Sequence, residues 1–254
     1  MQQHVSIEKF RDEILLNDQR LSAKPLLRRI YREFHIQIAQ RLSRGEGLTV
    51  EIGAGTVGLK SVVPDCISTD LFPTAGIDIM ENAYELSFKD ESLQNVILFD
   101  VFHHLEYPGS ALAEFRRVLK ADGRLIIFEP YTSFTGWICY GLLHKEPLGL
   151  LKSISWIAPE GRAPSEFMYY AAQGNATRIF RSKKYLEKLK AWRIREMKVL
   201  TSLSYVASGG FSGPQLYPEI CYPLLVQLDR LASLAPALFG TRLLVVLEPG
   251  RLPK

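Results

Sequence analysis

The chain has 254 residues, 47% of them hydrophobic and 23% charged, which are ordinary globular values and exclude disordered and fibrous proteins. Its 31 basic and 27 acidic residues give a net charge of +4, too small to indicate a nucleic-acid partner without a concentrated basic patch. The three cysteines lie far apart and form no pair with zinc or redox spacing, so we expect a reduced, cytoplasmic compartment.

Residues 1–47 are predicted to form a helical segment that precedes the sheet. Their opening lacks the apolar stretch of a signal peptide, and no apolar run in the chain reaches membrane-spanning length. One apolar stripe recurs every four residues and predicts a helix that begins near Pro25 and ends before Gly45. The stripe consists of Leu26, Ile30, Phe34, Ile38 and Leu42.

Residues 48–130 alternate between strand and helix patterns, as a parallel sheet requires. Polar residues follow the ends of the predicted strands, where open α/β sheets bind ligands. The predicted strands span residues 49–52, 66–69, 95–99 and 124–128. The predicted helices span residues 56–63 and the segment from Ser110 to the stop signal Asp122-Gly123.

The regular alternation stops after residue 130. Residues 131–181 are an aromatic-rich insertion, which we expect either to cover a substrate or to pack as a satellite helix pair. Residues 182–254 return to the core sheet, with strands predicted at 195–206 and 242–247 and an apolar helix at 223–234 between them. The predicted units are therefore an N-terminal helical segment, a core, an insertion and a C-terminal part of the core sheet.

The segment VEIGAGTVG, residues 50–58, contains three glycines at the spacing of a strand–turn–helix loop that approaches a ligand closely. The same spacing occurs in dinucleotide-binding folds, so a NAD-type oxidoreductase is an alternative. Glu51 favours a different ligand, because a carboxylate at the strand end suits a cationic group better than a pyrophosphate. S-adenosylmethionine (SAM) carries both an ammonium and a sulfonium.

This loop, an acid after the second strand, and the segments DVFHHL and LKADGRLIIFEP stand in an order that resembles the class I SAM-dependent methyltransferases, in particular the methyltransferase type 11 group. The resemblance covers roughly residues 48–130. It implies an α/β, Rossmann-like fold with a mostly parallel seven-stranded sheet and helices on both faces. It also implies SAM as the cofactor.

The resemblance assigns cofactor-binding positions along the loop and the strand ends. Glu51 would contact the ammonium of SAM, Asp70 would accept hydrogen bonds from both ribose hydroxyls, and Asn82 would read the adenine amine. Asn82 departs from the aspartate that is frequent in the family. The full predicted set is Glu51, Gly53, Ala54, Gly55, Asp70, Leu71, Asn82, Ala83 and Asp100.

A general base is needed only if the acceptor is a hydroxyl or a protonated amine. His104 is the first candidate, with His103 and Glu129 as alternatives, and a purely structural histidine remains open for this position. The substrate-contacting candidates are Tyr131, Trp137 and His144. No His/Asp/Glu set has metal-site spacing, so we predict no metal.

We expect a small-molecule acceptor methylated at oxygen, with a lipid-like or sugar-linked intermediate among the candidates. RNA or protein methylation is an alternative, since Arg116-Arg117, Lys183-Lys184 and the cations at 193–198 could form a basic patch, although adjacent charges usually mark solvated helix faces. A third alternative is a binding or scaffold protein that keeps the fold but has lost catalytic activity.

The apolar segment 222–238 suggests either peripheral membrane contact, or a core helix or dimer surface. The oligomeric state is not predicted.

Overall fold

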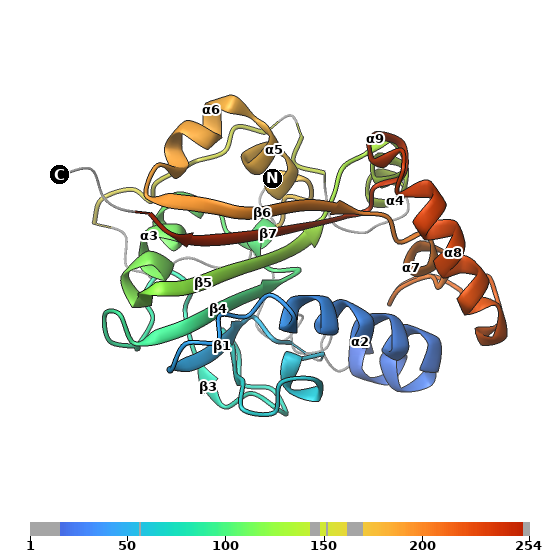
Figure 1. Cartoon of the computed structure of the whole chain (residues 1–254), viewed down its shortest axis with the longest axis horizontal. Coiled ribbons are helices and arrows are strands. Elements are labelled where there is room, and N and C mark those ends of the chain that lie inside the picture. Colours follow the sequence, from blue (N-terminus) through green and yellow to red (C-terminus); the bar gives the residue numbers. More distant parts are fainter. Residues whose placement is uncertain (1–15, 56, 143–147, 151, 162–169, 251–254) are drawn as a thin grey trace.

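The structure is a computed structural model that describes residues 16–55, 57–142, 148–150, 152–161 and 170–250. A single seven-stranded sheet runs through it in the order β3-β2-β1-β4-β5-β7-β6 (Figure 1). The strands are β1 Leu48–Ile52, β2 Ile67–Asp70, β3 Ile79–Met80, β4 Leu93–Phe99, β5 Leu119–Pro130, β6 Trp192–Leu200 and β7 Arg242–Pro249. The helices are α2 Pro25–Ala39, α3 Pro108–Val118, α4 Phe134–Leu142, α5 Asn175–Arg181, α6 Lys183–Leu186, α7 Leu203–Ala207, α8 Tyr222–Ala232 and α9 Pro236–Phe239.

The sheet is parallel except at β7, which pairs antiparallel with both β5 and β6. Because β7 reverses direction between them, β6 again points the same way as β5. The carboxyl ends of six strands therefore meet at one edge of the sheet, together with the start of β7. This architecture confirms the predicted Rossmann-like class I methyltransferase fold with its mostly parallel seven-stranded sheet.

Alternating side chains divide the apolar core into two layers, one on each face of the sheet. Val96 and Leu98 of β4 pack with α3 and α5 on one face, whereas Ile97 and Phe99 pack with α2 on the other. β5 and β7 alternate in the same way, as the period of two in a strand requires. In α2 the predicted stripe is confirmed, since Leu26, Ile30, Phe34 and Ile38 are buried and Leu42 is partly buried against the same layer.

The predicted helix over residues 56–63 is wrong for the part that the structure describes. Only a single 3-10 turn forms, at Leu59–Ser61. Its first amide, that of Leu59, donates to the carboxylate of Glu51 at 2.6 Å. Pro64 also disfavours helical backbone at Val63, because its ring crowds the preceding residue.

Three other predicted boundaries shift. α3 ends at Val118 and β5 begins at Leu119, so Asp122-Gly123 lies inside the strand instead of ending the helix. Ser110 lies within α3 and accepts a hydrogen bond from the Ala158 amide at 2.9 Å, so it is not the N-cap. The predicted strand 195–206 ends at Leu200, and α7 follows.

The apolar helix predicted at 223–234 is present as α8, at the end of the molecule toward which β5 and β6 point (Figure 1). Only Tyr222 of this helix is buried, so the interpretation as a core helix is wrong. No helix within the described residues is both long and apolar enough to span a bilayer.

Candidate functional site

The bend after β1 has a backbone that only glycine adopts easily. Gly53 has a φ of +69° and Gly55 a φ of +50°. A Cβ placed on Gly53 would lie 2.5 Å from Cγ2 of Val101, so this bend packs directly against the turn that follows β4. The bend therefore brings the ends of β1 and β4 into contact at the carboxyl edge of the sheet.

Glu51 is almost fully buried at the end of β1. Burial raises the pKa of Glu51 to about 8, the Leu59 amide opposes that rise, and the negative charge of Asp70 adds to it. A carboxyl with such a pKa is largely protonated at neutral pH, although a nearby cation would favour its charged form. This environment suits a ligand that brings positive charge.

Asp70 ends β2 beside the same bend and is also buried. Its two carboxylate oxygens accept hydrogen bonds from the amide of Gly55, at 3.1 Å, and from the amide of Phe72, at 3.2 Å. Burial raises the pKa of Asp70, and these amides oppose the rise. Among the described residues, no cationic side chain is bonded to Glu51 or Asp70, so this pair of acceptors fits the ammonium and hydroxyl donors of SAM.

The other predicted cofactor positions lie nearby in the chain. The side-chain oxygen of Asn82 accepts a hydrogen bond from the Tyr84 amide at 3.0 Å, which fixes a local turn. Ala83 is partly buried against the core, and Leu71, directly after Asp70, is 38% exposed. Ala54 is buried and its amide donates to the Thr69 carbonyl at 2.9 Å. Their roles toward the cofactor stay predictions.

Asp100 follows β4 with a φ of +57°, a left-handed conformation that is uncommon for a non-glycine residue. Its carboxylate is ion-paired with the guanidinium of Arg242, the first residue of β7. Burial raises the pKa of Asp100, and Arg242 opposes the rise. Sequence reasoning missed Arg242, because an arginine at the start of a strand is ordinarily solvent-exposed, yet this one is 1% exposed.

Glu129, at the end of β5, and His103 form a fully enclosed pair. Nδ1 of His103 lies 2.6 Å from one carboxylate oxygen of Glu129, and the other oxygen accepts from the Phe102 amide at 2.6 Å. Nε2 of His103 lies 3.0 Å from the side-chain nitrogen of Gln173 in the insertion. Both ring nitrogens therefore have partners within the protein, and sequence reasoning had not identified Gln173.

His104 is held differently. Its Nδ1 lies 2.8 Å from the carbonyl oxygen of Tyr170, which can only accept, so Nδ1 carries the hydrogen. In the neutral ring, Nε2 then carries the lone pair. The residue is half-buried, and its ring centroid lies 4.0 Å from that of His103. Of the two histidines, His104 is the more accessible to solvent.

The three predicted substrate residues do not form one group in the described structure. Tyr131 is 7% exposed within the core, and its amide donates to the Thr241 carbonyl at 2.9 Å. Trp137, on α4, is 47% exposed. His144 lies outside the described residues. No group of three or more potential metal-ligating side chains occurs in the part of the chain that the structure describes.

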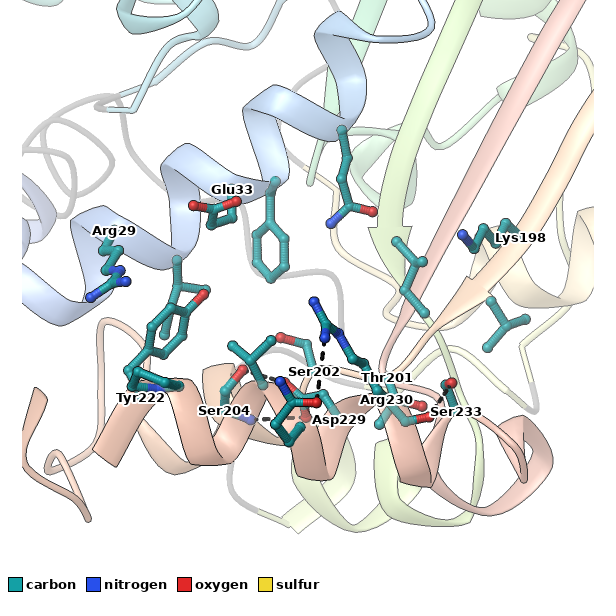
Figure 2. Close-up of a pocket in the computed structure, with 18 residues that line it drawn as sticks. Arg29, Glu33, Lys198, Thr201, Ser202, Ser204, Tyr222, Asp229, Arg230 and Ser233 are labelled. Carbon is teal, nitrogen blue, oxygen red and sulfur yellow. Dashed lines mark hydrogen bonds between the residues drawn. The ribbon is translucent and has the colours of Figure 1, made fainter. Parts of the chain in front are cut away.

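A separate open groove of about 550 Å³ lies between α2, α8 and the end of β6 (Figure 2). Arg29 and Glu33 of α2 line one side, and Arg230 of α8 extends its guanidinium into the groove from the other. Lys198 lines the end formed by β6. None of the predicted site residues lines this groove.

Comparison with known proteins identifies the chemistry of the core. Residues 51–127 match the family model described as a methyltransferase domain. This match covers the bend, both buried acids and the two histidines, and it decides between SAM and a dinucleotide in favour of SAM. No curated protein matches the chain.

Several solved structures share the fold. A chain from a Haloferax volcanii complex of the Trm112 methyltransferase activator with a methyltransferase is 15% identical, with a TM-score of 0.55, and the alignment covers 98% of this chain and 100% of that one. A Thermotoga maritima SAM-dependent methyltransferase, described as a possible histamine N-methyltransferase, is 18% identical over 88% of this chain and 91% of its own, with a TM-score of 0.51.

Geranyl diphosphate C-methyltransferase from Streptomyces coelicolor, in complex with Mg²⁺, geranyl-S-thiolodiphosphate and S-adenosyl-L-homocysteine, is 13% identical, with a TM-score of 0.50. The alignment covers 87% of this chain and 76% of that one. At these identities the likeness supports the fold, and the family match supports the activity.

Proposed function

We propose that this chain, which belongs to the class I SAM-dependent methyltransferases, methylates a hydroxyl oxygen of a small molecule with His104 as the general base. The observation that carries the proposal is the position of His104. It follows β4 in the turn whose Val101 packs against Gly53, so the imidazole belongs to the same edge of the sheet as the two buried acids.

The cofactor is held by the bend and by the two buried carboxyl groups. We assign the ammonium to Glu51, whose raised pKa indicates an acid that lacks a positive partner of its own. We assign the ribose hydroxyls to Asp70, since its two oxygens can accept two donors. When bound, SAM supplies a methyl group that is activated by its attachment to a sulfonium.

His104 is suited to accept a proton from an acceptor hydroxyl. The Tyr170 carbonyl fixes the tautomer, because it takes the hydrogen of Nδ1 and leaves Nε2 as the basic nitrogen. Positioned bases of this kind contribute roughly 10²–10⁴-fold to reactions that remove a proton. His103 lies against this ring, and its bond to Glu129 fixes its own orientation, so we assign the pair a positioning role.

A small acceptor is favoured over RNA because several arginines of the predicted basic patch are already paired with carboxylates of the protein. Arg193 and Arg195 both pair with Glu248, and Arg117 pairs with Glu114 and Asp90. These carboxylates neutralise much of the positive charge that phosphate binding would require.

We further propose that the insertion, residues 131–181, covers the acceptor, with Trp137 at its entrance. We also propose that the acceptor is lipid-like or sugar-linked.

The test combines binding with labelled turnover. Wild type, His104→Ala and His104→Gln are titrated with SAM by calorimetry and incubated with methyl-labelled SAM and a metabolite extract. We expect unchanged SAM affinity and at least about a hundredfold less product in both variants, with partial rescue of His104→Ala by added imidazole. Full activity of both variants, or a labelled product methylated at nitrogen or carbon, would refute the proposal.

A further inference from the structure

One part of the insertion crosses directly over the turn that carries the two histidines. The Ala172 amide donates to the His103 carbonyl at 3.1 Å, and Nδ1 of His104 lies 2.8 Å from the Tyr170 carbonyl. Between these two backbone contacts, the side-chain nitrogen of Gln173 lies 3.0 Å from Nε2 of His103. Backbone and side chain of the insertion therefore bond to both histidines at once.

The backbone of Gln173 is itself fixed from the far side. The residue is 2% exposed, and its carbonyl accepts from the Gly149 amide at 2.9 Å, beside the bridge between Leu148 and Gln173. Ala172 packs closely there, since a Cβ on Gly149 would lie 2.6 Å from its own Cβ. The guanidinium of Arg178, on α5, donates to the Gly149 carbonyl. The side chain of Gln173 thus projects from a held position.

The two neighbours of the His103 ring together decide which nitrogen carries the hydrogen. The amide nitrogen of Gln173 can only donate, so Nε2 of His103 accepts. Nδ1 then carries the hydrogen and donates it to the carboxylate of Glu129, at 2.6 Å. A ring held in this way is neutral, with both nitrogens hydrogen-bonded.

The charge on His103 matters because its ring centroid lies 4.0 Å from that of His104. A proton taken up by His104 creates a positive charge, which a second imidazolium beside it would oppose. Asp100 is within electrostatic reach of His103 and Glu129, but it is ion-paired with Arg242. Because Asp100 and Arg242 neutralise one another, Glu129 and the protonation state of His103 set the charge next to His104.

We propose that Gln173 is a positioning residue that holds His103 as the neutral ring with its hydrogen on Nδ1, so that no cation lies against His104. The expected effect on turnover rests on the proposed role of His104 as the base, whereas the state of the His103 ring does not. The insertion would then have a second task besides covering the acceptor. It would keep the base able to take up a proton.

Nitrogen-15 NMR of the full chain with labelled histidine reads the ring directly, with neither SAM nor acceptor present. We expect His103 of the wild type to carry a hydrogen on Nδ1 alone at about pH 7. In Gln173→Glu the new carboxylate accepts, so Nε2 should gain a hydrogen as well. Spectra of His103→Gln and His104→Gln assign the signals. A hydrogen on Nε2 of His103 in the wild type would overturn the proposal, as would an unchanged His103 spectrum in Gln173→Glu.

Labelled methyl transfer tests the consequence for the reaction. Gln173→Leu and Gln173→Glu should transfer methyl at least about tenfold more slowly, while calorimetric SAM affinity changes less than about twofold. The matched control is Gln94→Leu. Gln94 is 1% exposed, and its NH₂ group donates to the Ser43 hydroxyl and the Asp122 carbonyl at the amino end of β4. This control should transfer methyl as the wild type does, and thermal melting checks that each variant is folded.

The two readouts separate this proposal from that of the base. Wild-type turnover in both Gln173 variants would overturn the positioning role, whatever the spectra show. Full activity of His104→Gln, together with the expected His103 spectra, would refute His104 as the base and still support the hold of Gln173 on the His103 ring.

Discussion

Asp100 and Arg242, which are 142 positions apart in the chain, form an ion pair that joins the end of β4 to the start of β7. The guanidinium is 4.5 Å from the ring centroid of Tyr205 and 5.3 Å from that of Phe34. The pair therefore connects the strand that leads to the two histidines with α2 and α7. It fixes the backbone of Asp100 just before the turn that carries the proposed base.

Arg242→Met should destabilise the fold by leaving the Asp100 carboxylate without its partner. We expect a loss of about 3 kcal/mol in the free energy of unfolding, at the low end for a buried pair because the side chain of Asp100 is 28% exposed. Urea denaturation measures the loss. The exposed Arg28→Met on α2 is the control and should change stability by less than about 0.5 kcal/mol. Adding Asp100→Asn should recover part of the loss, and an unchanged midpoint in Arg242→Met would contradict this account.

Gly53→Ala should be more costly than Gly76→Ala, although both glycines have positive φ, +69° and +92°. A Cβ at Gly76 meets nothing within 4 Å, so that variant reports the backbone cost alone, about 1 kcal/mol. At Gly53 the new methyl overlaps Val101, which adds about 1–3 kcal/mol. Chemical unfolding measures both variants. Adding Val101→Ala to Gly53→Ala should recover some of that extra cost, and equal losses at the two glycines would rule out the overlap.

Glu51→Gln should make stability less dependent on pH. Burial raises the pKa of Glu51 to about 8, whereas the pKa of a glutamate in an unfolded chain is about 4.3. The stability linked to this proton is fully present below the unfolded value and is lost as pH rises through about 8. The glutamine variant keeps an acceptor for the Leu59 amide and has no carboxyl to titrate.

Melting temperatures of wild type and Glu51→Gln across this range measure the effect. The advantage of the variant should grow with pH, by an amount on the order of a few kcal/mol between about pH 5 and pH 9. SAM affinity of the wild type should rise over the same range and that of the variant should be lower throughout, as calorimetry would detect. A constant difference in melting temperature would contradict the assigned titration.

Glu129→Gln should lower turnover more than SAM binding. The glutamine oxygen can still accept from the Phe102 amide, but its NH₂ group would then face Nδ1–H of His103, donor against donor. The His103 ring would have to turn, and His104 packs against it. We expect labelled methyl transfer to fall about tenfold or more while calorimetric SAM affinity changes less than about twofold. Glu187→Gln, at an exposed position, is the control, and equal losses in turnover and affinity would contradict a positioning role.

Local patterns predicted most of the fold. The alternation in β4 and β5 and the four-residue stripe of α2 specify which face each side chain covers. The glycines after β1 and the acids at the ends of β1 and β2 indicate the edge of the sheet at which we propose that the cofactor binds. These signals are short-range, because each lies within a few residues of chain.

What the sequence could not predict depends on long-range contacts. The partner of Asp100 lies at the far end of the chain, and Gln173 reaches His103 from within an insertion with no regular pattern. α8 illustrates a different limit. Its residues are apolar enough for a core helix, and only the packing of Val226 and Asp229 against the groove reveals that Leu224, Leu228 and Leu231 are turned outward.

The location of β7 also dictates when the protein can acquire its native form during synthesis. β7, residues Arg242–Pro249, sits between β5 and β6 and supplies hydrogen bonds to both. Until the ribosome has released this strand, β6 has no neighbour, β5 presents an open flank, and Asp100 has no counter-charge. A nascent chain would therefore carry two exposed sheet edges until residues 242–249 have left the ribosome, and that interval is when chaperones would be most needed.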